Sequence, residues 1–225
     1  MGSDRPKALI EFGMETLIEA SSQSIAPYVD EIVVVVSPDH KAEFERSLPS
    51  IHGRVTRYVT QASPSGTAEA VLIGLSSVSS SRSVIMWGDH IGASQLSIEP
   101  LLDLCSESQA ELFVPIVRRQ RPYVYFEFDN SLQPLTFNET RKGAIEIESG
   151  WSDCGVFLVD TVAVKDYLET CDLSVEGDTN FLAMFPSMVL KGLRFQTVEM
   201  YDQNLTLGAN TQHELELARS LFHGR

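Results

Sequence analysis

The hydrophobic and polar positions along the chain predict strands that alternate with helices. Glu31–Val36 is a β-branched run typical of a strand buried on both faces, and residues 84–87 form a second such run. Further strands are expected at residues 55–60, 112–117, 155–159 and 194–200, and helices at residues 13–26, 38–48, 67–78, 98–108, 178–190 and 211–222. This alternation predicts a Rossmann-like α/β fold with an open, mostly parallel sheet and helices on both faces.

The pattern changes in the middle of the chain. Residues 124–128 and 135–137 alternate in polarity around a turn at residues 129–131, which predicts an antiparallel β-hairpin inserted in the α/β unit. Neither a repeat nor a long linker is visible, so we expect a single domain over residues 1–225.

Composition and charge exclude several function classes. The formal net charge of −14 leaves no basic groove for nucleic acid. Cys105, Cys154 and Cys171 are too widely spaced for a disulfide framework or a metal knuckle, which favours a reducing compartment. The longest apolar run, residues 32–36, is too short to cross a bilayer, and residues 1–7 lack the apolar core of a signal peptide. We therefore expect a cytoplasmic protein with no membrane or nucleic-acid partner.

A loop of small residues, residues 60–66, joins a predicted strand to a predicted helix. Gln61 carries both a donor and an acceptor and can contact a nucleotide base with both. Gly66 lets the backbone approach a ligand, and Thr67 can cap the helix and present its hydroxyl. An ordinary strand-to-helix turn is the alternative interpretation, and spacing alone does not separate the two.

Candidate polar residues follow other predicted elements. Asp89 comes directly after the strand at 84–87, where ligands bind in open α/β sheets, and a carboxylate there can hold Mg²⁺ or simply form a turn. His90 beside it is interpreted as structural. Asn210 can cap the last helix or direct its carbonyl oxygen at the same cation. Glu139 and Asp153 can accept hydrogen bonds from substrate hydroxyls or remain solvated loop carboxylates.

In order along the chain, these motifs resemble the nucleotidyltransferase (sugar-phosphate pyrophosphorylase) superfamily, and in particular its N-acetylglucosamine-1-phosphate uridylyltransferase domains. Residues 5–9, Arg-Pro-Lys-Ala-Leu, resemble the family's Pro-Lys-x-Leu motif, and Gln61 with residues 66–70 resembles its Gln…Gly-Thr-Ala-x-Ala loop. Gly88-Asp89 resembles its Gly-Asp metal site, and residues 208–211 resemble its Gly-Val-Asn-Thr motif. Glu139 and residues 153–156 resemble its sugar-contacting Glu and its Asn-x-Gly element.

The resemblance implies the nucleotide-diphospho-sugar transferase fold and a transfer reaction. A nucleoside triphosphate and a small phosphorylated acceptor, such as a sugar-1-phosphate, would be the partners, pyrophosphate would be released, and a homo-oligomer is compatible with the family. The implied roles are catalysis by Lys7 and Asp89, Mg²⁺ binding by Asp89 and Asn210, nucleotide binding by Arg5, Gln61, Gly66, Thr67 and Gly88, and acceptor binding by Glu139 and Asp153.

The sequence departs from the family pattern in three places. Only residues 1–5 stand where the family has a strand and a Gly-x-Gly-Thr-Arg loop, so we expect a sheet without its first strand and weak or no turnover by this chain. An N-terminally truncated or degenerate, non-catalytic relative is therefore the alternative function. Asp153 replaces an Asn, and residues 122–127 differ from the Gly-Tyr-Gly-Arg-type loop of sugar enzymes, which leaves phosphocholine-like, phosphonate and unusual sugar phosphate acceptors open. A glycosyltransferase ranks below both because no Asp-x-Asp motif is present.

Overall fold

The computed structural model of the protein describes residues 5–173 and 179–222. Its strands are β1 (Glu11–Phe12), β2 (Glu15–Thr16), β3 (Glu31–Val36), β4 (Ser50–Ile51), β5 (Arg54–Thr60), β6 (Arg82–Met86), β7 (Leu112–Gln120), β8 (Val124–Phe128), β9 (Pro134–Glu139), β10 (Ser149–Asp153), β11 (Val156–Asp160) and β12 (Phe195–Met200). Its α-helices are α1 (Leu17–Ser22), α2 (Pro38–Ser47), α3 (Thr67–Ser76), α4 (Glu99–Glu107), α5 (Thr161–Glu169), α6 (Phe185–Leu190) and α7 (Gln212–Phe222). Short 3-10 helices lie at Lys7–Leu9, Ala26–Tyr28, Ile91–Gln95, Thr140–Lys142, Phe181–Met184 and Gln203–Thr206.

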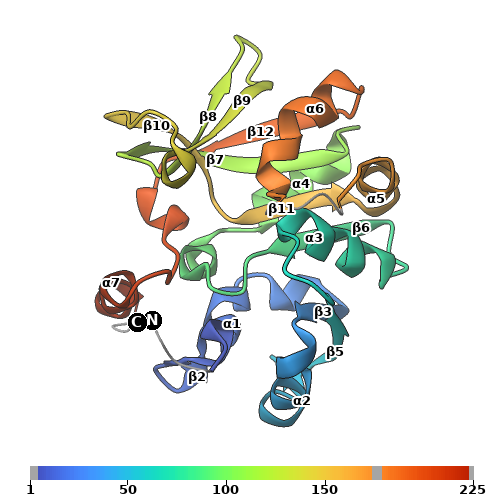
Figure 1. Ribbon diagram of the computed structural model, residues 1–225, viewed down its shortest axis with the longest axis vertical. Helices are drawn as coiled ribbons and strands as arrows, with labels where there is room; N and C mark the ends of the chain where they lie inside the picture. Colours follow the sequence, from blue (N-terminus) through green and yellow to red (C-terminus); the bar gives the residue numbers. More distant parts are fainter. Residues whose placement is uncertain (1–4, 174–178, 223–225) are drawn as a thin grey trace.

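In the described part of the chain, the large sheet has the strand order β6-β11-β7-β10-β8-β9 (Figure 1). Strand β12 lies outside this order and pairs in parallel with β7. Strands β10 and β11 both run antiparallel to β7, and β11 also runs antiparallel to β6. The predicted hairpin is β8 and β9, which pair antiparallel from Val124 opposite Glu139. The α/β class is confirmed, but this sheet is mixed rather than mostly parallel, because β10 and β11 return through it in the reverse direction.

A smaller sheet contains β3, β5 and β4. The β-branched residues of β3 pair in parallel with β5, from Glu31 opposite Val55 to Val36 opposite Thr60. Among the described residues, β3 has no strand partner on its edge away from β5, and β6 has none on its edge away from β11. Among the described residues, the two sheets are thus not joined by strand pairing.

The side chains of the large sheet alternate between two helical layers. Leu112, Val114 and Ile116 of β7 pack in one core cluster with residues of α3, α5 and α6. Phe113 and Val117 of the same strand pack in a second cluster with α4. Because successive side chains of a strand point to opposite faces, this period-two burial confirms the prediction of helices on both faces.

Two predicted helices are shorter than expected. The helix predicted at residues 13–26 begins only at α1, because β1 and β2 pair across a turn and Glu19 accepts hydrogen bonds from both the backbone N–H and the hydroxyl of Thr16. The helix predicted at residues 178–190 is a 3-10 turn followed by α6, which begins beside Pro186, a residue that cannot donate a helical hydrogen bond. Asp178, where that helix was predicted to begin, lies outside the described residues.

Helix α5 and strand β10 are among the elements that were not predicted. Helix α5 begins at Thr161 after its N-cap Asp160, whose carboxylate accepts a hydrogen bond from Ala163 N at 3.0 Å. Strand β10 contains Asp153, which could have been a solvated loop carboxylate. Over the described ranges, no helix is both long and apolar enough to cross a membrane.

Candidate functional site

Three predicted site residues converge from distant parts of the chain. The ammonium of Lys7 lies 3.7 Å from Asp89 Oδ2 and 3.5 Å from Asn210 Oδ1. Lys7 opens a 3-10 helix, Asp89 follows β6, and Asn210 precedes α7. The backbone holds the last two together, because Ala209 N donates to Asp89 O at 2.8 Å. The structure thus brings together the residues to which the sequence assigned catalysis and metal binding.

The chemistry of this triad suits a cation. Carboxylate and amide carbonyl oxygens are the hard ligands that Mg²⁺ takes, usually with water and substrate phosphates completing the shell. The Lys7 ammonium already lies between the two oxygens, so a positive charge is accommodated there. Within the described ranges, no three His, Cys, Asp or Glu side chains gather as a metal site. A cation at this position would therefore depend on Asp89, Asn210 and non-protein oxygens.

The amide of Gln61 is held inside its own loop. Its Nε2 donates to Gly66 O at 3.0 Å, to Ser65 Oγ at 3.1 Å and to Glu69 Oε2 at 2.8 Å. A carbonyl and a carboxylate only accept, so they fix the orientation of the amide. Gln61 therefore presents one acceptor, Oε1, rather than the donor and acceptor pair that a bidentate base contact needs.

Glu69 is a site residue that the sequence interpretation missed. Hydrogen bonds from Ser65 and Gln61 lower the pKa of its carboxyl below the ordinary value. A lowered pKa means that the ionised form stabilises this loop above the ordinary carboxyl pKa, and that this contribution disappears as the pH falls through the lowered value. Its position in the first turn of α3, eight residues after Gln61, was the available signal.

The backbone at Gly66 and the hydroxyl of Thr67 contact Thr179 and Phe181, and nucleotide binding by Gly66 and Thr67 stays a prediction. Ala68 N donates to Thr179 O at 3.0 Å, and Thr67 Oγ1 accepts from Phe181 N at 2.8 Å. Gly66 has φ +112°, and a Cβ built on it would lie 2.3 Å from Thr179 N. The glycine is needed for this close backbone approach, whereas the sequence interpretation attributed it to ligand approach.

We expect Gly66→Ala to destabilise the protein more than Gly143→Ala. Both glycines have positive φ, but a Cβ at Gly143 meets nothing within 4 Å. Gly143→Ala should cost only the backbone strain, about 1–2 kcal/mol, whereas Gly66→Ala adds a backbone clash and should exceed it by at least about 1 kcal/mol. Urea denaturation of both variants measures the difference. Equal losses would contradict the close approach of Thr179.

The other predicted nucleotide-binding residues are placed as follows. Arg5 Nε lies 3.6 Å from Glu43 Oε1 of α2, so its guanidinium is ion-paired. Gly88 packs near Ile18, and a Cβ there would make only ordinary contacts of 3.6–3.7 Å. Nucleotide binding by these two residues stays a prediction.

The two predicted acceptor-binding carboxylates lie in different surroundings. Glu139 lines a cavity of about 520 Å³ with Asn180 and Lys142, whose ammonium lies 3.6 Å from Glu139 Oε2. Asp153 is 8% exposed, and its Oδ1 accepts from Gly155 N at 2.8 Å in a tight turn. Burial raises the pKa of Asp153, which favours its neutral form. Asp153 therefore has a visible turn-forming role, and its contact with an acceptor stays a prediction.

His90 is structural, as expected. It is 9% exposed, its Nε2 is 2.8 Å from Leu205 O, and its ring packs against Gly155, where a Cβ would lie 2.4 Å from Nδ1. Gly155 has φ +69°, so both its conformation and its close neighbour require glycine.

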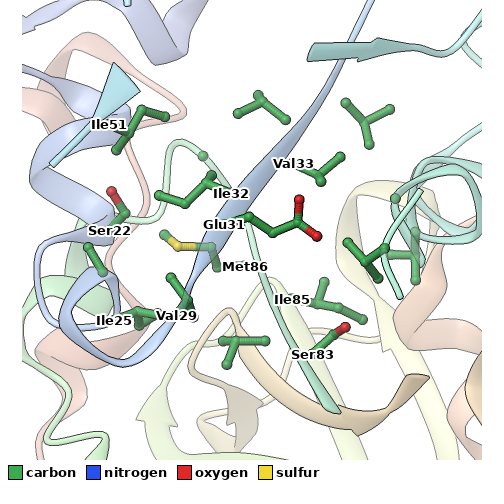
Figure 2. Close-up of a pocket in the computed structure, with 18 of the residues that line it drawn as sticks. Ser22, Ile25, Val29, Glu31, Ile32, Val33, Ile51, Ser83, Ile85 and Met86 are labelled. Atoms are coloured by element: carbon green, nitrogen blue, oxygen red, sulfur yellow. The ribbon is translucent and has the colours of Figure 1, made fainter. Parts of the chain in front are cut away.

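A large cavity adjoins the Lys7 site. It has a volume of about 1300 Å³, and both Lys7 and Asp89 line it together with residues of β3, β6 and α3. Figure 2 shows Ile32 and Val33 of β3 and Met86 of β6 around this space. We call it the inter-sheet cavity.

Comparison with known proteins identifies the family. The MobA-like NTP transferase domain family matches residues 1–152. The chain is 26% identical over 140 residues to glucose-1-phosphate thymidylyltransferase of Neisseria gonorrhoeae, covering 61% of this chain and 48% of that protein. It is 23% identical over 232 residues to the bifunctional protein GlmU of Buchnera aphidicola subsp. Acyrthosiphon pisum, covering 99% of this chain and 48% of that protein. The chain thus spans about half the length of these curated relatives.

Solved structures share the fold. A putative glucose-1-phosphate thymidylyltransferase from Bacillus anthracis, in complex with a sucrose, superimposes with a TM-score of 0.77 at 18% identity, covering 97% of this chain and 87% of that one. HddC from Yersinia pseudotuberculosis gives a TM-score of 0.68 at 13% identity, covering 99% and 92%. Since the family match extends over more than half of the sequence, the chain belongs to the MobA-like NTP transferase domain family of nucleotidyltransferases.

Proposed function

We propose that this domain, residues 1–225, is a Mg²⁺-dependent nucleotidyltransferase that couples a nucleoside triphosphate to a sugar-1-phosphate or another small phosphorylated metabolite. The observation that carries the proposal is the convergence of Lys7, Asp89 and Asn210. The Lys7 ammonium lies 3.7 Å from Asp89 Oδ2 and 3.5 Å from Asn210 Oδ1. Relatives named as a thymidylyltransferase and as GlmU support the reaction class, at 23–26% identity.

The proposed step is an in-line displacement. A phosphate oxygen of the acceptor forms a bond to the α-phosphorus of the triphosphate while the bond from that phosphorus to the bridging β-phosphate oxygen breaks, and pyrophosphate leaves with the electron pair. Mg²⁺ held by Asp89 and Asn210 would neutralise phosphate charge. Lys7 leaves its ion pair with Asp89 and binds phosphate oxygens, since its side chain is 44% exposed and can reorient.

Nucleotide and acceptor are proposed to contact different side chains near the start of α3, because Thr179 and Asn180, which line the Glu139 cavity, lie against the first residues of this helix. Gln61 Oε1 accepts from a base N–H, because its amide nitrogen is held by Glu69 and Gly66. Glu139 receives acceptor hydroxyls, since its Oε2 is buried, makes no hydrogen bond with the described residues and is neutralised only by Lys142 at 3.6 Å. This acceptor role favours a substrate that donates hydrogen bonds near its phosphate.

A non-catalytic relative is the second candidate. The observation in its favour is that the backbone at the start of α3 is engaged by Thr179, so Ala68 N does not face an anion.

The experiment combines the purified chain, Mg²⁺ and each common nucleoside triphosphate with a panel of sugar-1-phosphates, phosphocholine and phosphonates. Since weak or no turnover is expected of this chain, we expect at most slow pyrophosphate release, with one triphosphate and one acceptor class, abolished by EDTA and restored by Mg²⁺. Calorimetry with the same triphosphates runs in parallel. Nucleotide binding without pyrophosphate release would favour the non-catalytic candidate, and the absence of both would overturn the proposal.

A further inference from the structure

Two arginine side chains lie over the same tyrosine ring. The central carbon of the Arg119 guanidinium is 5.6 Å from the centre of the Tyr123 ring, and that of Arg141 is 4.5 Å from it. Both distances fall within the range of cation–π contacts. Among the described residues, neither guanidinium forms an ion pair with a carboxylate. In a chain with a formal net charge of −14, this arrangement calls for an explanation. We call Arg119 and Arg141 the arginine pair.

Backbone contacts position the arginine pair. Arg119 is the last residue but one of β7, and Arg141 lies in the 3-10 helix directly after β9. Thr140 N donates to Tyr123 O at 2.9 Å, which joins this helix to the turn that carries the ring. Within the described ranges, the two guanidiniums donate one hydrogen bond, from Arg119 Nη1 to Thr206 O at 3.5 Å. Most of their N–H donors are therefore available to an oxyanion.

The register of the large sheet places Arg119 level with Asp89. Val84 of β6 and Phe113 of β7 both lie opposite Leu158 of β11, and both strands run antiparallel to β11. Strands β6 and β7 are therefore parallel to each other. Asp89 comes five residues after Val84, and Arg119 comes six residues after Phe113. Both thus lie at the carboxyl ends of their strands, on the edge of the sheet where open α/β proteins bind ligands.

The arginine pair lies farther from β6 than one phosphate group extends. Two strand spacings separate β6 from β7 in the order of the large sheet, which amounts to about 10 Å. Tyr123 precedes β8 and Arg141 follows β9, and both of these strands lie beyond β7 as seen from β6. A phosphate bound at Asp89 therefore does not reach the shared ring, whereas the far end of a molecule the size of a phosphorylated hexose does.

Asp153, a predicted acceptor-binding residue, lies between the two positions. Burial raises the pKa of its carboxyl, and the charges of His90 and Arg119 oppose this rise. Burial also raises the pKa of the Tyr123 hydroxyl, and the charge of Asp153 adds to this effect. His90 directly follows Asp89, so Asp153 is near the end of β6 on one side and near the arginine pair on the other. An acceptor that contacts Asp153 is within reach of both.

The chemistry of the arginine pair selects an oxyanion. A planar guanidinium matches a carboxylate or a phosphate and can donate two parallel hydrogen bonds to it. Two like charges over one ring repel each other, and an oxyanion bound by both replaces this repulsion with attraction. The Tyr123 ring supports both guanidiniums without neutralising them, so their charge stays available to a ligand.

We infer that the arginine pair binds a second acidic group of the acceptor, a carboxylate or a second phosphate, at the end of the acceptor remote from the phosphate that reacts. The inference rests on the proposed function for the presence of a phosphorylated acceptor, and it narrows the acceptor to metabolites with two acidic groups. The arginine pair binds and orients this second group and takes no part in bond formation.

The test compares three ligands that differ at one carbon of the sugar. Glucose-1-phosphate has a hydroxyl at carbon 6, glucuronic acid 1-phosphate has a carboxylate there, and glucose-1,6-bisphosphate has a second phosphate. Calorimetry with the full chain measures each Kd at constant Mg²⁺ and ionic strength. We expect one of the two doubly acidic ligands to bind at least about tenfold more tightly than glucose-1-phosphate, and its identity distinguishes carboxylate from phosphate.

Arg141→Gln and Arg119→Gln test the assignment to these side chains. Each should bring the Kd of the preferred ligand to within about twofold of the Kd of glucose-1-phosphate, which should itself stay unchanged. The matched control is Arg121→Gln, which removes an equal charge from the exposed turn after β7 and should keep the preference. Urea midpoints establish that the variants are folded, and Arg141 is exposed, so its substitution should not impair folding.

Four outcomes would overturn the inference. These are equal Kd values for the three ligands, no binding of any of them, a preference that survives both glutamine variants, and an equal loss of affinity for all three ligands in Arg141→Gln. The last would assign the arginine pair to the phosphate that reacts. The proposed function fails separately: a preference that Arg141→Gln removes, without pyrophosphate release from any acceptor, would support the arginine pair and contradict the transfer reaction.

Discussion

Asp89→Asn should reduce pyrophosphate release by at least about 100-fold, which corresponds to about 2.7 kcal/mol of lost transition-state stabilisation. The substitution removes the one carboxylate in the Lys7 triad, and an amide holds a divalent cation far less strongly. The fold should be preserved, because Asp89 anchors residues 208–210 through its backbone oxygen, which accepts from Ala209 N. The measurement is the initial rate with the best triphosphate and acceptor at saturating Mg²⁺.

The matched control is Asp103→Asn, which removes an equal charge from the exposed face of α4. It should change the rate by less than about twofold, since distant exposed charges are screened. Circular dichroism and the urea midpoint establish that both variants are folded. If Asp89→Asn retains the wild-type rate and the wild-type Mg²⁺ affinity, Asp89 does not hold the cation.

The Lys7 triad is the part of the candidate site that the sequence located best. Asp89 was placed by a general rule, since ligands bind beyond the carboxyl ends of strands in open α/β sheets. Lys7 and Asn210, 203 residues apart, were placed only by the resemblance of their motifs. No periodicity could have joined them, because their contact depends on how the chain ends pack beside β6.

The Gln61 loop was located correctly along the chain but its internal contacts were not predictable. Gly66 owes its conformation to Thr179, which is 113 residues away, and Gln61 is held by Glu69 through a hydrogen bond of 2.8 Å. Long-range packing of this kind leaves no local pattern. The internal contacts of the loop were therefore not foreseen, and its contact with a nucleotide stays a prediction.

Helix α5 was missed although its signals were present. Asp160 is a favourable N-cap, and Val164, Tyr167 and Leu168 follow at helical spacing and are buried. The sequence interpretation assigned only a strand to this part of the chain, because the apolar run of β11 lies directly before the helix. The prediction of a mostly parallel sheet was wrong for a different reason. The direction of a strand depends on its pairing across the sheet and not on local periodicity.

Phe185→Ala should destabilise the protein by about 3–5 kcal/mol, the largest stability loss that we expect from one core substitution. Phe185 is 1% exposed and lies at the centre of an aromatic cluster. Its ring stacks on Phe126 at 5.8 Å and makes edge contacts with Phe157, Phe181 and Phe195 at 5.2–5.6 Å. Truncation leaves a cavity and removes these pairs, and urea denaturation measures the loss.

The effect should extend to the Gln61 loop, because Phe181 belongs to the segment that holds α3. Thr179 O accepts from Ala68 N, so loosening Phe181 should accelerate hydrogen exchange at Ala68. The control is Leu190→Ala at the end of the same helix, where the side chain is 87% exposed and the loss should stay within about 0.5 kcal/mol. A loss below about 1 kcal/mol for Phe185→Ala, or unchanged exchange at Ala68, would contradict the role of this cluster in fixing the loop.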